Sequence, residues 1–285
     1  MMETNVVSFN DAARARDESI AYISDEALRS AQPVIDAGSC HVALDRCTII
    51  MQAKTSRYAL FKDLSAAFPK QRRIAVLGHK GSGKTVLIDM MLKRRAVQKG
   101  RVIVNSRLSW SVSFVQYLDG RLTLRQNMIF IARVLNVDPS YLIGAALEIC
   151  NFQQGQLKER MGNMPISMRR RIGLLVYLLG NFDCHIIDGP LRGMMFGQMN
   201  ERLEAMMSAV TSRDYIAALS EPRQVPSNCD LLHILYNGRL FMFEDVARGM
   251  EIYQSLPTPE NPNPFAGQDD KDDGSDDESV AVDLM

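Results

Sequence analysis

Short apolar runs alternate with helix-like patterns along the middle of this 285-residue chain. Buried strands are predicted at four runs, over 74–77, 184–187, 216–219 and 231–236, and Asn237-Gly238 predicts a tight turn into a fifth strand over 239–243. Apolar residues at helical spacing predict helices over 87–91, 122–137, 141–151, 172–179 and 199–210. Strands that alternate with helices favour a largely parallel sheet with helices on both faces, so we expect an α/β fold.

The two ends of the chain differ from this middle region. Residues 1–40 are polar with mixed charge, and we expect an N-terminal extension that is either disordered or loosely docked. From residue 256 the sequence is rich in Pro and Asn and then in Asp, a composition that buries too little apolar surface to fold. The predicted organisation is an extension over 1–40, a folded domain over 41–255 and a disordered acidic tail over 256–285.

The formal net charge of zero conceals an uneven distribution. From Pro257 onward the chain holds nine acidic residues and one lysine, which leaves residues 1–256 with a net charge of about +8. The tail either folds back on this basic body or stays extended by self-repulsion, and partner docking is a weaker alternative. The basic run Arg169–Arg171 predicts a solvated helix face, and without interleaved aromatic residues it does not predict nucleic-acid binding.

Cysteine, histidine and hydropathy patterns exclude several other classes. Five scattered cysteines without a Cys-x-x-Cys pair predict reduced thiols, and four scattered histidines predict no metal site built from protein ligands alone. No run approaches the roughly 18 apolar residues of a membrane-spanning helix, and the N-terminus lacks a secretory-signal pattern. We therefore expect a cytoplasmic protein that reaches a membrane only through a partner.

One motif carries specific chemistry: residues 78–85 fit the phosphate-binding loop pattern G-x-x-x-x-G-K-[ST] without a gap. Glycines let backbone N–H groups turn toward phosphate oxygens, and the following helix adds its positive end. The lysine would reach the β- and γ-phosphates, and the threonine hydroxyl would hold Mg²⁺. The predicted nucleotide-binding residues of this loop are Gly78, His79, Lys80, Gly81, Ser82, Gly83, Lys84 and Thr85.

A phosphate-binding loop also needs an acidic residue for the metal at the end of a second strand. Asp188 follows the apolar run 185–187, about 100 residues downstream, and is the best candidate. An aspartate after a strand is usually only a turn residue, but beside this loop we interpret it as a Mg²⁺ ligand together with Thr85.

The loop, the wide spacing to Asp188 and the block Met168–Leu179 together resemble ABC-transporter ATPase subunits. The closer similarity is to the ATP-binding subunits of capsular-polysaccharide and O-antigen exporters. Their typical segment YSSGMRARLAFALSLAIDFDCYLIDEV looks like the stretch 164–190, Tyr58–Leu64 resembles the strand that opens the domain, and Cys229–Leu240 looks like the last hairpin. The resemblance spans residues 40–253 and leaves out both ends.

This resemblance implies a P-loop NTPase fold of the ABC-ATPase type, with a helical subdomain around 122–180. The implied cofactors are ATP and Mg²⁺. The implied partners are a transmembrane permease subunit of an ABC exporter and a second ATPase chain, either a copy of this chain or an active paralogue. The implied location is cytoplasmic, peripheral on the inner face of the plasma membrane through the permease.

Three further nucleotide contacts follow from the resemblance alone. Tyr58 looks like the aromatic residue that stacks on adenine, although a core aromatic residue is nearly as consistent with its position. Gln116 is the nearest candidate for the glutamine that senses the γ-phosphate and Mg²⁺, and Asp119 is the alternative. Ser167 stands in the signature loop that closes over the nucleotide of the opposite subunit.

The sequence departs from the family pattern where hydrolysis is carried out. In the signature loop Ile166 and Ser167 replace the expected Ser and Gly, and a Cβ at the glycine position blocks close backbone approach. Gly189 replaces the glutamate that acts as general base, Met195 the aspartate of the next loop and Glu221 the switch histidine. Losing a general base typically slows a reaction by about 10²–10⁴ and losing a transition-state donor by about 10²–10³.

Three functions are consistent with this pattern. The favoured one is a pseudo-ATPase that binds Mg-ATP through an intact loop and hydrolyses it poorly or not at all alone. The second is an active exporter motor with unrecognised substitutes for the lost groups. The third is a structural scaffold that binds no nucleotide, which leaves the complete phosphate-binding loop unexplained.

Overall fold

The computed structural model describes residues 37–52, 57–111, 118–189 and 212–257, together with positions 201, 205, 208 and 209. Most of the predicted N-terminal extension and acidic tail therefore lies outside the described residues, as does most of the helix predicted over 199–210.

A five-stranded sheet forms the centre of the molecule, in the order β5-β6-β3-β7-β8. Its strands are β3 (Arg73–Leu77), β5 (His185–Asp188), β6 (Tyr215–Leu219), β7 (Leu231–Tyr236) and β8 (Arg239–Phe243). The first four are parallel, and β8 turns back antiparallel to β7 through Asn237 and Gly238, both with positive φ. All five predicted strands and the tight turn are confirmed.

A second sheet was not predicted. It consists of β1 (Cys40–Gln52), β2 (Arg57–Pro69) and β4 (Lys99–Val104), antiparallel in the order β2-β1-β4. The interpretation of 58–64 as the strand that opens the domain is wrong, because β1 precedes β2 and pairs with it along nearly its whole length.

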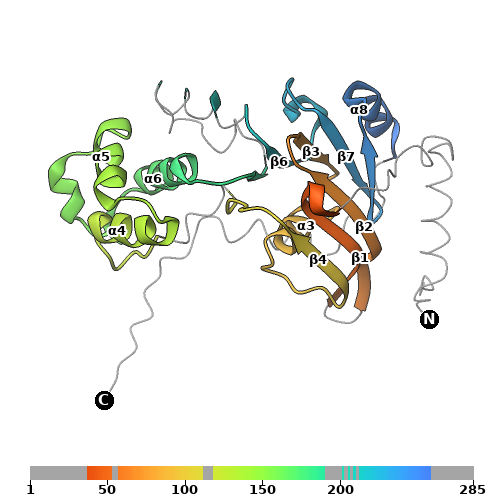
Figure 1. Ribbon diagram of the computed structural model, residues 1–285, viewed down its shortest axis with the longest axis horizontal. Helices are drawn as coiled ribbons and strands as arrows, with labels where there is room; N and C mark the ends of the chain where they lie inside the picture. The colour runs from red at the N-terminus through yellow and green to blue at the C-terminus, as the bar shows by residue number, and fades with distance from the viewer. Residues whose placement is uncertain are drawn as a thin grey trace, which may run out of the picture.

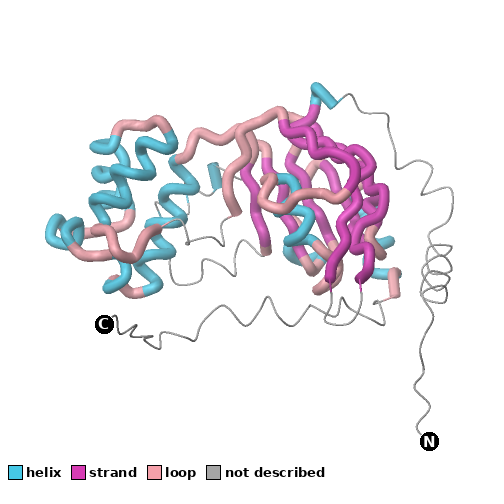
Figure 2. Tube along the Cα trace, turned by 90° about the horizontal axis from the view of Figure 1, so that it is seen from below, coloured by secondary structure: helices cyan, strands magenta, loops and turns pink. Residues whose placement is uncertain are grey.

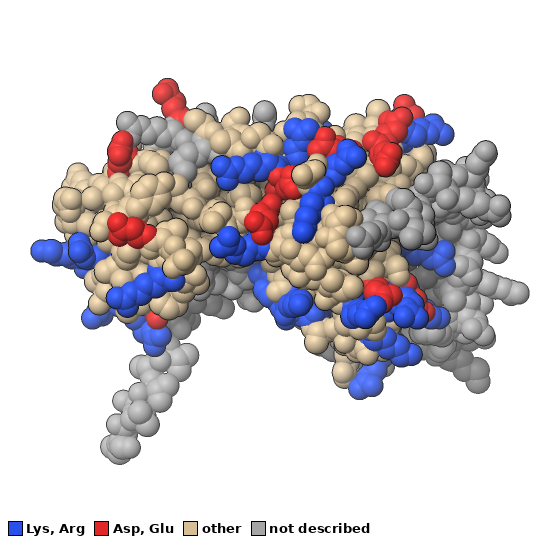
Figure 3. Space-filling model, viewed as in Figure 1, with Lys and Arg blue, Asp and Glu red and all other residues tan. Residues whose placement is uncertain are grey.

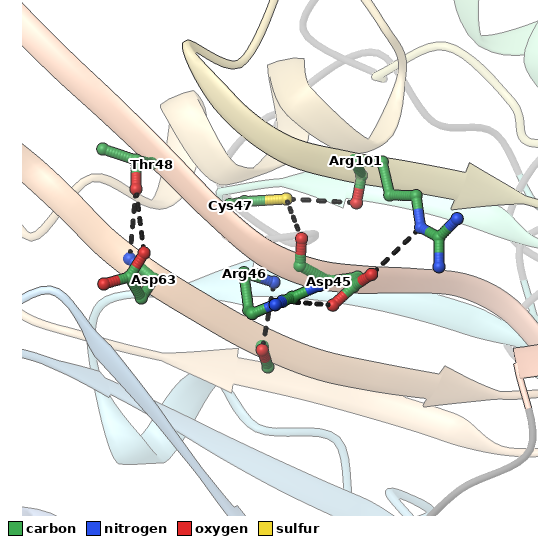
Figure 4. A network of polar contacts seen from close by, with 7 residues as sticks. Asp45, Arg46, Cys47, Thr48, Asp63 and Arg101 are labelled. Carbon is green, nitrogen blue, oxygen red and sulfur yellow. Dashed lines mark hydrogen bonds and ion pairs between the residues drawn. The ribbon is translucent and has the colours of Figure 1, made fainter.

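Bulges in β1 explain why the sequence pattern did not predict this strand. The pairing of β1 shifts between Leu44 and Cys47 on the side of β2 and between Asp45 and Thr48 on the side of β4, and Arg46 has a φ of 49°. Around this kink the Asp45 carboxylate accepts from Arg101 at 2.9 Å, and the Thr48 hydroxyl accepts from the Asp63 amide at 3.2 Å (Figure 4). Asp45 and Arg46, in the middle of β1, interrupt the alternation of apolar and polar residues that would otherwise identify the strand.

Five helices complete the described fold. They are α3 (Lys84–Met91), α4 (Leu124–Leu135), α5 (Pro139–Ile149), α6 (Ile166–Leu179) and α8 (Val246–Ser255). Four short 3-10 helices connect them or precede the first sheet, η1 (Ala37–Ser39), η2 (Gln154–Lys158), η3 (Met161–Asn163) and η5 (Pro222–Gln224). Thr123 begins α4 with a reciprocal capping box to Gln126, and Asp138 caps α5 ahead of Pro139. No helix in the described part of the chain has the length and hydropathy to span a membrane.

Helices α4, α5 and α6 gather at one end of an elongated molecule. Figure 1 shows α4, α5 and α6 together at the left, with the sheets, α3 and α8 on the right. Figure 2 shows the same cluster of helices at one end, and further helix segments among the strands at the other. Lys and Arg are interspersed with Asp and Glu on the face shown in Figure 3. The predicted helical subdomain around 122–180 is present.

The two faces of the central sheet belong to different apolar clusters. Alternate residues such as Leu77, Ile187 and Leu219 pack in a cluster with α4, α5, α6 and α8. Their chain neighbours Val76 and Ile186 point to the other face, where the residues of β1, β2 and α3 cover them. This arrangement fixes the carboxyl end of β3, from which the phosphate-binding loop emerges.

Candidate nucleotide-binding site

The backbone of residues 78–83 has a conformation that requires its glycines. Gly81 and Gly83 have φ values of 81° and 98°, a region that side chains disfavour, and Gly83 is the residue before α3. A Cβ on Gly78 would lie 2.6 Å from Ser82 Oγ and 2.9 Å from the Leu235 carbonyl oxygen. The backbone conformation of the loop therefore explains why glycine stands at positions 78, 81 and 83.

The Lys84 side chain lies inside this loop. Its ammonium group donates to the carbonyl oxygens of Gly78 and His79, each at 2.8 Å. Burial lowers the pKa of Lys84 to about 8, and the negative charge of Asp188 opposes that shift. A cation is thus held where a phosphate group would approach the backbone N–H groups.

Thr85 and Asp188 meet although 102 residues separate them in the sequence. Asp188 ends β5, and its carboxylate accepts a hydrogen bond from the Thr85 hydroxyl in the first turn of α3. Burial raises the pKa of Asp188, and Thr85 and Lys84 oppose the shift. A hydroxyl and a carboxylate are the oxygen ligands that Mg²⁺ takes from proteins when nucleotide phosphates supply others.

Thr85 and Asp188 therefore fit a Mg²⁺ ion that takes its other ligands from nucleotide phosphates. Among the residues that the structure describes, no group of three His, Cys, Asp or Glu side chains is gathered for a metal ion. The buried Ser82 hydroxyl also has no hydrogen-bond partner in the described structure, which leaves a donor within the loop.

His79 and Lys80 behave differently from each other. Lys80 is exposed, whereas the His79 ring stacks on Tyr253 of α8 with ring centroids 4.9 Å apart. Burial and Lys84 lower the pKa of His79, and burial raises the pKa of Tyr253 to about 12. Sequence reasoning missed Tyr253, which follows the loop by 174 positions and carries no local signal.

Tyr58 lies on β2, whose later residues approach the phosphate-binding loop. It lies half-buried on β2, and the next residues of that strand, Leu60 and Phe61, approach Gly83 so closely that a Cβ there would lie about 3 Å from both. The adenine-stacking role of Tyr58 stays a prediction.

Gln116 and Asp119 are the two candidates for the position of the glutamine that senses the γ-phosphate. Gln116 lies outside the described residues. Asp119 is held by Arg121, which donates two side-chain hydrogen bonds to its carboxylate and lowers its pKa to about 2. Its backbone is tied to Asn127 of α4, so Asp119 belongs to the entry of the helical subdomain.

Ser167 lies in the first turn of α6, which begins after Pro165 without a side-chain cap. Figure 1 places α6 with the helical end of the molecule and α3 within the strand end.

The positions expected to carry hydrolysis hold other groups. Gly189 has a φ of 99°, and its amide donates to the Ala218 carbonyl at 2.9 Å. Glu221 stands directly before η5, and its carboxylate pairs with the guanidinium of Arg223, so it is engaged within its own turn. Met195 lies outside the described residues.

The fold is that of an ABC-type ATPase, with a P-loop core and a helical subdomain. Residues 61–192 match the sequence model of the ABC transporter family. Solved structures share the fold: the dimeric ATP-binding cassette MJ0796 bound to ADP and Pi superposes with a TM-score of 0.55 at 11% identity, over 71% of this chain and 98% of that one. An ATP-binding subunit of an ABC transporter gives 0.56 at 15% identity, over 75% and 98%.

Within that class the chain is similar to capsule-export proteins. It is 27% identical to the capsule polysaccharide export ATP-binding protein CtrD of Neisseria meningitidis serogroup B, over 68% of this chain and 90% of the relative. Identity to the ATP-binding protein BexA of Haemophilus influenzae is 26%, over 68% and 89%. The polysialic acid transport ATP-binding protein KpsT of Escherichia coli is 27% identical over 75% and 96%. The resemblance to exporter ATPases is confirmed.

Proposed function

We propose that this chain is the ATP-binding subunit of an ABC system that exports a capsule- or O-antigen-type polysaccharide. It binds Mg-ATP through residues 78–85 and hydrolyses it poorly or not at all alone. The similarity to capsule polysaccharide and polysialic acid transport proteins supports the cargo class. Its folded domain over 41–255 acts at the inner face of the membrane, where it associates with a permease subunit and with a second ATPase chain.

The contrast between two neighbouring positions carries this proposal. Asp188 keeps its contact with Thr85, whereas the next residue, Gly189, has no side chain and a left-handed backbone. Binding depends on Lys84, Thr85, Asp188 and the loop backbone, all of which are present. Activation of the attacking water depends on a base directly after Asp188, and that position is occupied by Gly189.

The individual roles follow from the chemistry of the side chains. Lys84 neutralises the β- and γ-phosphates, and Thr85 and Asp188 hold Mg²⁺. Tyr58 stacks on the adenine ring, and Gln116 contacts the γ-phosphate and its metal. Ser167 of one chain approaches the nucleotide held by the other chain of the dimer.

Binding and turnover of Mg-ATP on the purified chain test the proposal. Lys84→Ala should weaken binding about tenfold or more, because hydrogen bonds to charged groups contribute roughly 1.5–3 kcal/mol. Lys70→Ala is the matched control, since this exposed lysine precedes β3 whereas the loop follows it. Wild type should bind ATP and turn it over no faster than Lys84→Ala; Lys84-dependent turnover by the isolated chain would establish an active motor instead.

A pair of substitutions at position 189 locates the defect. Gly189→Glu restores the carboxylate, but the φ of 99° strains any side chain there. Gly189→Ala introduces the same strain without the carboxylate and serves as the control. Turnover that rises in Gly189→Glu relative to Gly189→Ala would assign the loss of hydrolysis to the missing base.

A further inference from the structure

The side chain of His79 lies between two tyrosines from distant elements. Tyr253 of α8 stacks on one side, with an angle of 24° between the rings, and Tyr236 at the end of β7 approaches edge-on with centroids 6.3 Å apart. Both tyrosines are almost fully buried. The second residue of the phosphate-binding loop is therefore packed against α8 and β7 rather than directed into solvent.

The Tyr253 hydroxyl joins two loops at the same edge of the sheet. It donates to the Ser220 carbonyl oxygen at 3.1 Å and lies 3.4 Å from His79 Nδ1. Because a hydroxyl has one proton, it accepts from Nδ1 when that nitrogen is the protonated one. One side chain thus connects the loop after β3 with the loop after β6, where the switch residue of the ABC pattern would stand.

α8 itself is firmly attached to β7 and β8. A Cβ on Gly249 would lie 2.8 Å from Leu232 Cδ2 and 3.1 Å from Phe243 Cβ, which shows how closely the helix approaches the sheet. Its N-terminus is capped by Asp245, and Tyr236 donates to the Pro257 carbonyl oxygen at 3.2 Å just after its C-terminus. Tyr253 therefore projects from a fixed support.

We propose that Tyr253 is a positioning residue for the phosphate-binding loop. Through the stack on His79 and the bond to Ser220, α8 holds both loops in one arrangement relative to the sheet. The His79 carbonyl oxygen accepts a hydrogen bond from Lys84, so a shift of His79 would also displace the ammonium group that contacts phosphate. The identity of the ligand as Mg-ATP rests on the function proposed above.

Amide hydrogen exchange tests the positioning without any nucleotide. In the full chain, Tyr253→Phe keeps the ring and removes the hydroxyl, and amides of residues 79–85 should exchange about fivefold faster, as expected for one lost hydrogen bond. Tyr215→Phe is the matched control, because it removes another hydroxyl from a buried tyrosine, bonded to Asn228, at the opposite end of β6. Equal exchange of residues 79–85 in the two variants would overturn the proposal.

Mg-ATP affinity tests the consequence. Tyr253→Phe should bind about fivefold more weakly than wild type, Tyr253→Ala more weakly still, and Tyr215→Phe within about twofold of wild type. In a His79→Phe background the effect of Tyr253→Phe should fall below about fivefold, because the contribution through His79 is lost while the bond to Ser220 remains.

The two proposals fail in different ways. Lys84-dependent ATP binding that Tyr253→Phe leaves unchanged would overturn the positioning role and leave the proposed function intact. Absence of Lys84-dependent binding in wild type would overturn the proposed function, and hydrogen exchange of residues 79–85 would still decide whether Tyr253 positions the loop.

Discussion

Replacing Asp230 by asparagine should loosen the strand that carries the phosphate-binding loop. Asp230 precedes β7, and its carboxylate accepts from Arg73 Nε at 2.8 Å and Nη2 at 2.7 Å, with a third bond from the Arg73 amide at 2.9 Å. Arg73 is the first residue of β3, so this pair fixes the start of β3 to β7. Asparagine keeps one acceptor and loses the charge and the bidentate geometry.

The pKa of Asp230 sets the magnitude. The Arg73 guanidinium lowers it from 3.8 to about 2, against a smaller opposing effect of burial. One pKa unit corresponds to about 1.4 kcal/mol, so the shift corresponds to at most about 2.5 kcal/mol. Both side chains retain about a quarter to a third of their exposure, and solvent screening reduces the expected loss in the free energy of unfolding to about 1–2 kcal/mol.

The pH dependence has a defined sign. Because the folded-state pKa is lowered, the stabilisation is present above the unfolded value near 3.8 and disappears as the pH falls through about 2. Urea unfolding of wild type and Asp230→Asn should differ fully at pH 7 and by about half as much at pH 3.

Asp45→Asn provides the control, since Asp45 also pairs with two arginines, but the side chains of Arg46 and Arg101 are 78% and 73% exposed, against 30% for Arg73. Exposed ion pairs contribute little, so this variant should unfold almost as wild type does. Equal stability of Asp230→Asn and Asp45→Asn at pH 7 would refute the role assigned to the Arg73 pair.

Two further predictions concern stability. In urea unfolding, Gly100→Ala should lower the free energy of unfolding by about 3 kcal/mol, because φ is 79° and the Cβ would lie 2.3 Å from the Arg46 carbonyl oxygen. Gly144→Ala is the control: the Cβ has open space in α5, so the free energy of unfolding should rise by up to about 1 kcal/mol. Asn127→Ala should cost about 2–3 kcal/mol by calorimetry and free the turn at Asp119, because the two N–H groups of this buried amide are shared among three carbonyl oxygens there, whereas Gln126 is exposed. Loss of no more than about 0.5 kcal/mol in either destabilising variant would contradict the packing described.

The parts of the fold that the sequence predicted are those with a strong local signal. The central strands are short apolar runs buried on both faces, and the turn at Asn237-Gly238 and the loop over 78–85 each need residue types that few other structures require. Asp188 was found because the loop chemistry demands a carboxylate at a strand end, and the structure indeed brings it to Thr85.

The remainder depends on contacts that no local pattern encodes. β1 was missed because bulges interrupt its alternation at Asp45 and Arg46, and β4 because it is short, largely exposed and contains Gly100. The stack of His79 on Tyr253 arises only when α8 docks on the sheet. No local sequence pattern indicates such a contact between residues that lie far apart in the chain.

The shared apolar cluster bears on how this chain can be divided. Residues of α4, α5 and α6 pack in the same continuous interior as Ala75, Leu77 and Ile187 of the central sheet. Separating these helices from the sheet would break that interior, together with the hydrogen bond that the Tyr177 hydroxyl of α6 donates to the Ile186 carbonyl oxygen of β5. The helical end is therefore not a transplantable module: a chimera that exchanges it with a relative must exchange the inward-facing positions of the strands along with it.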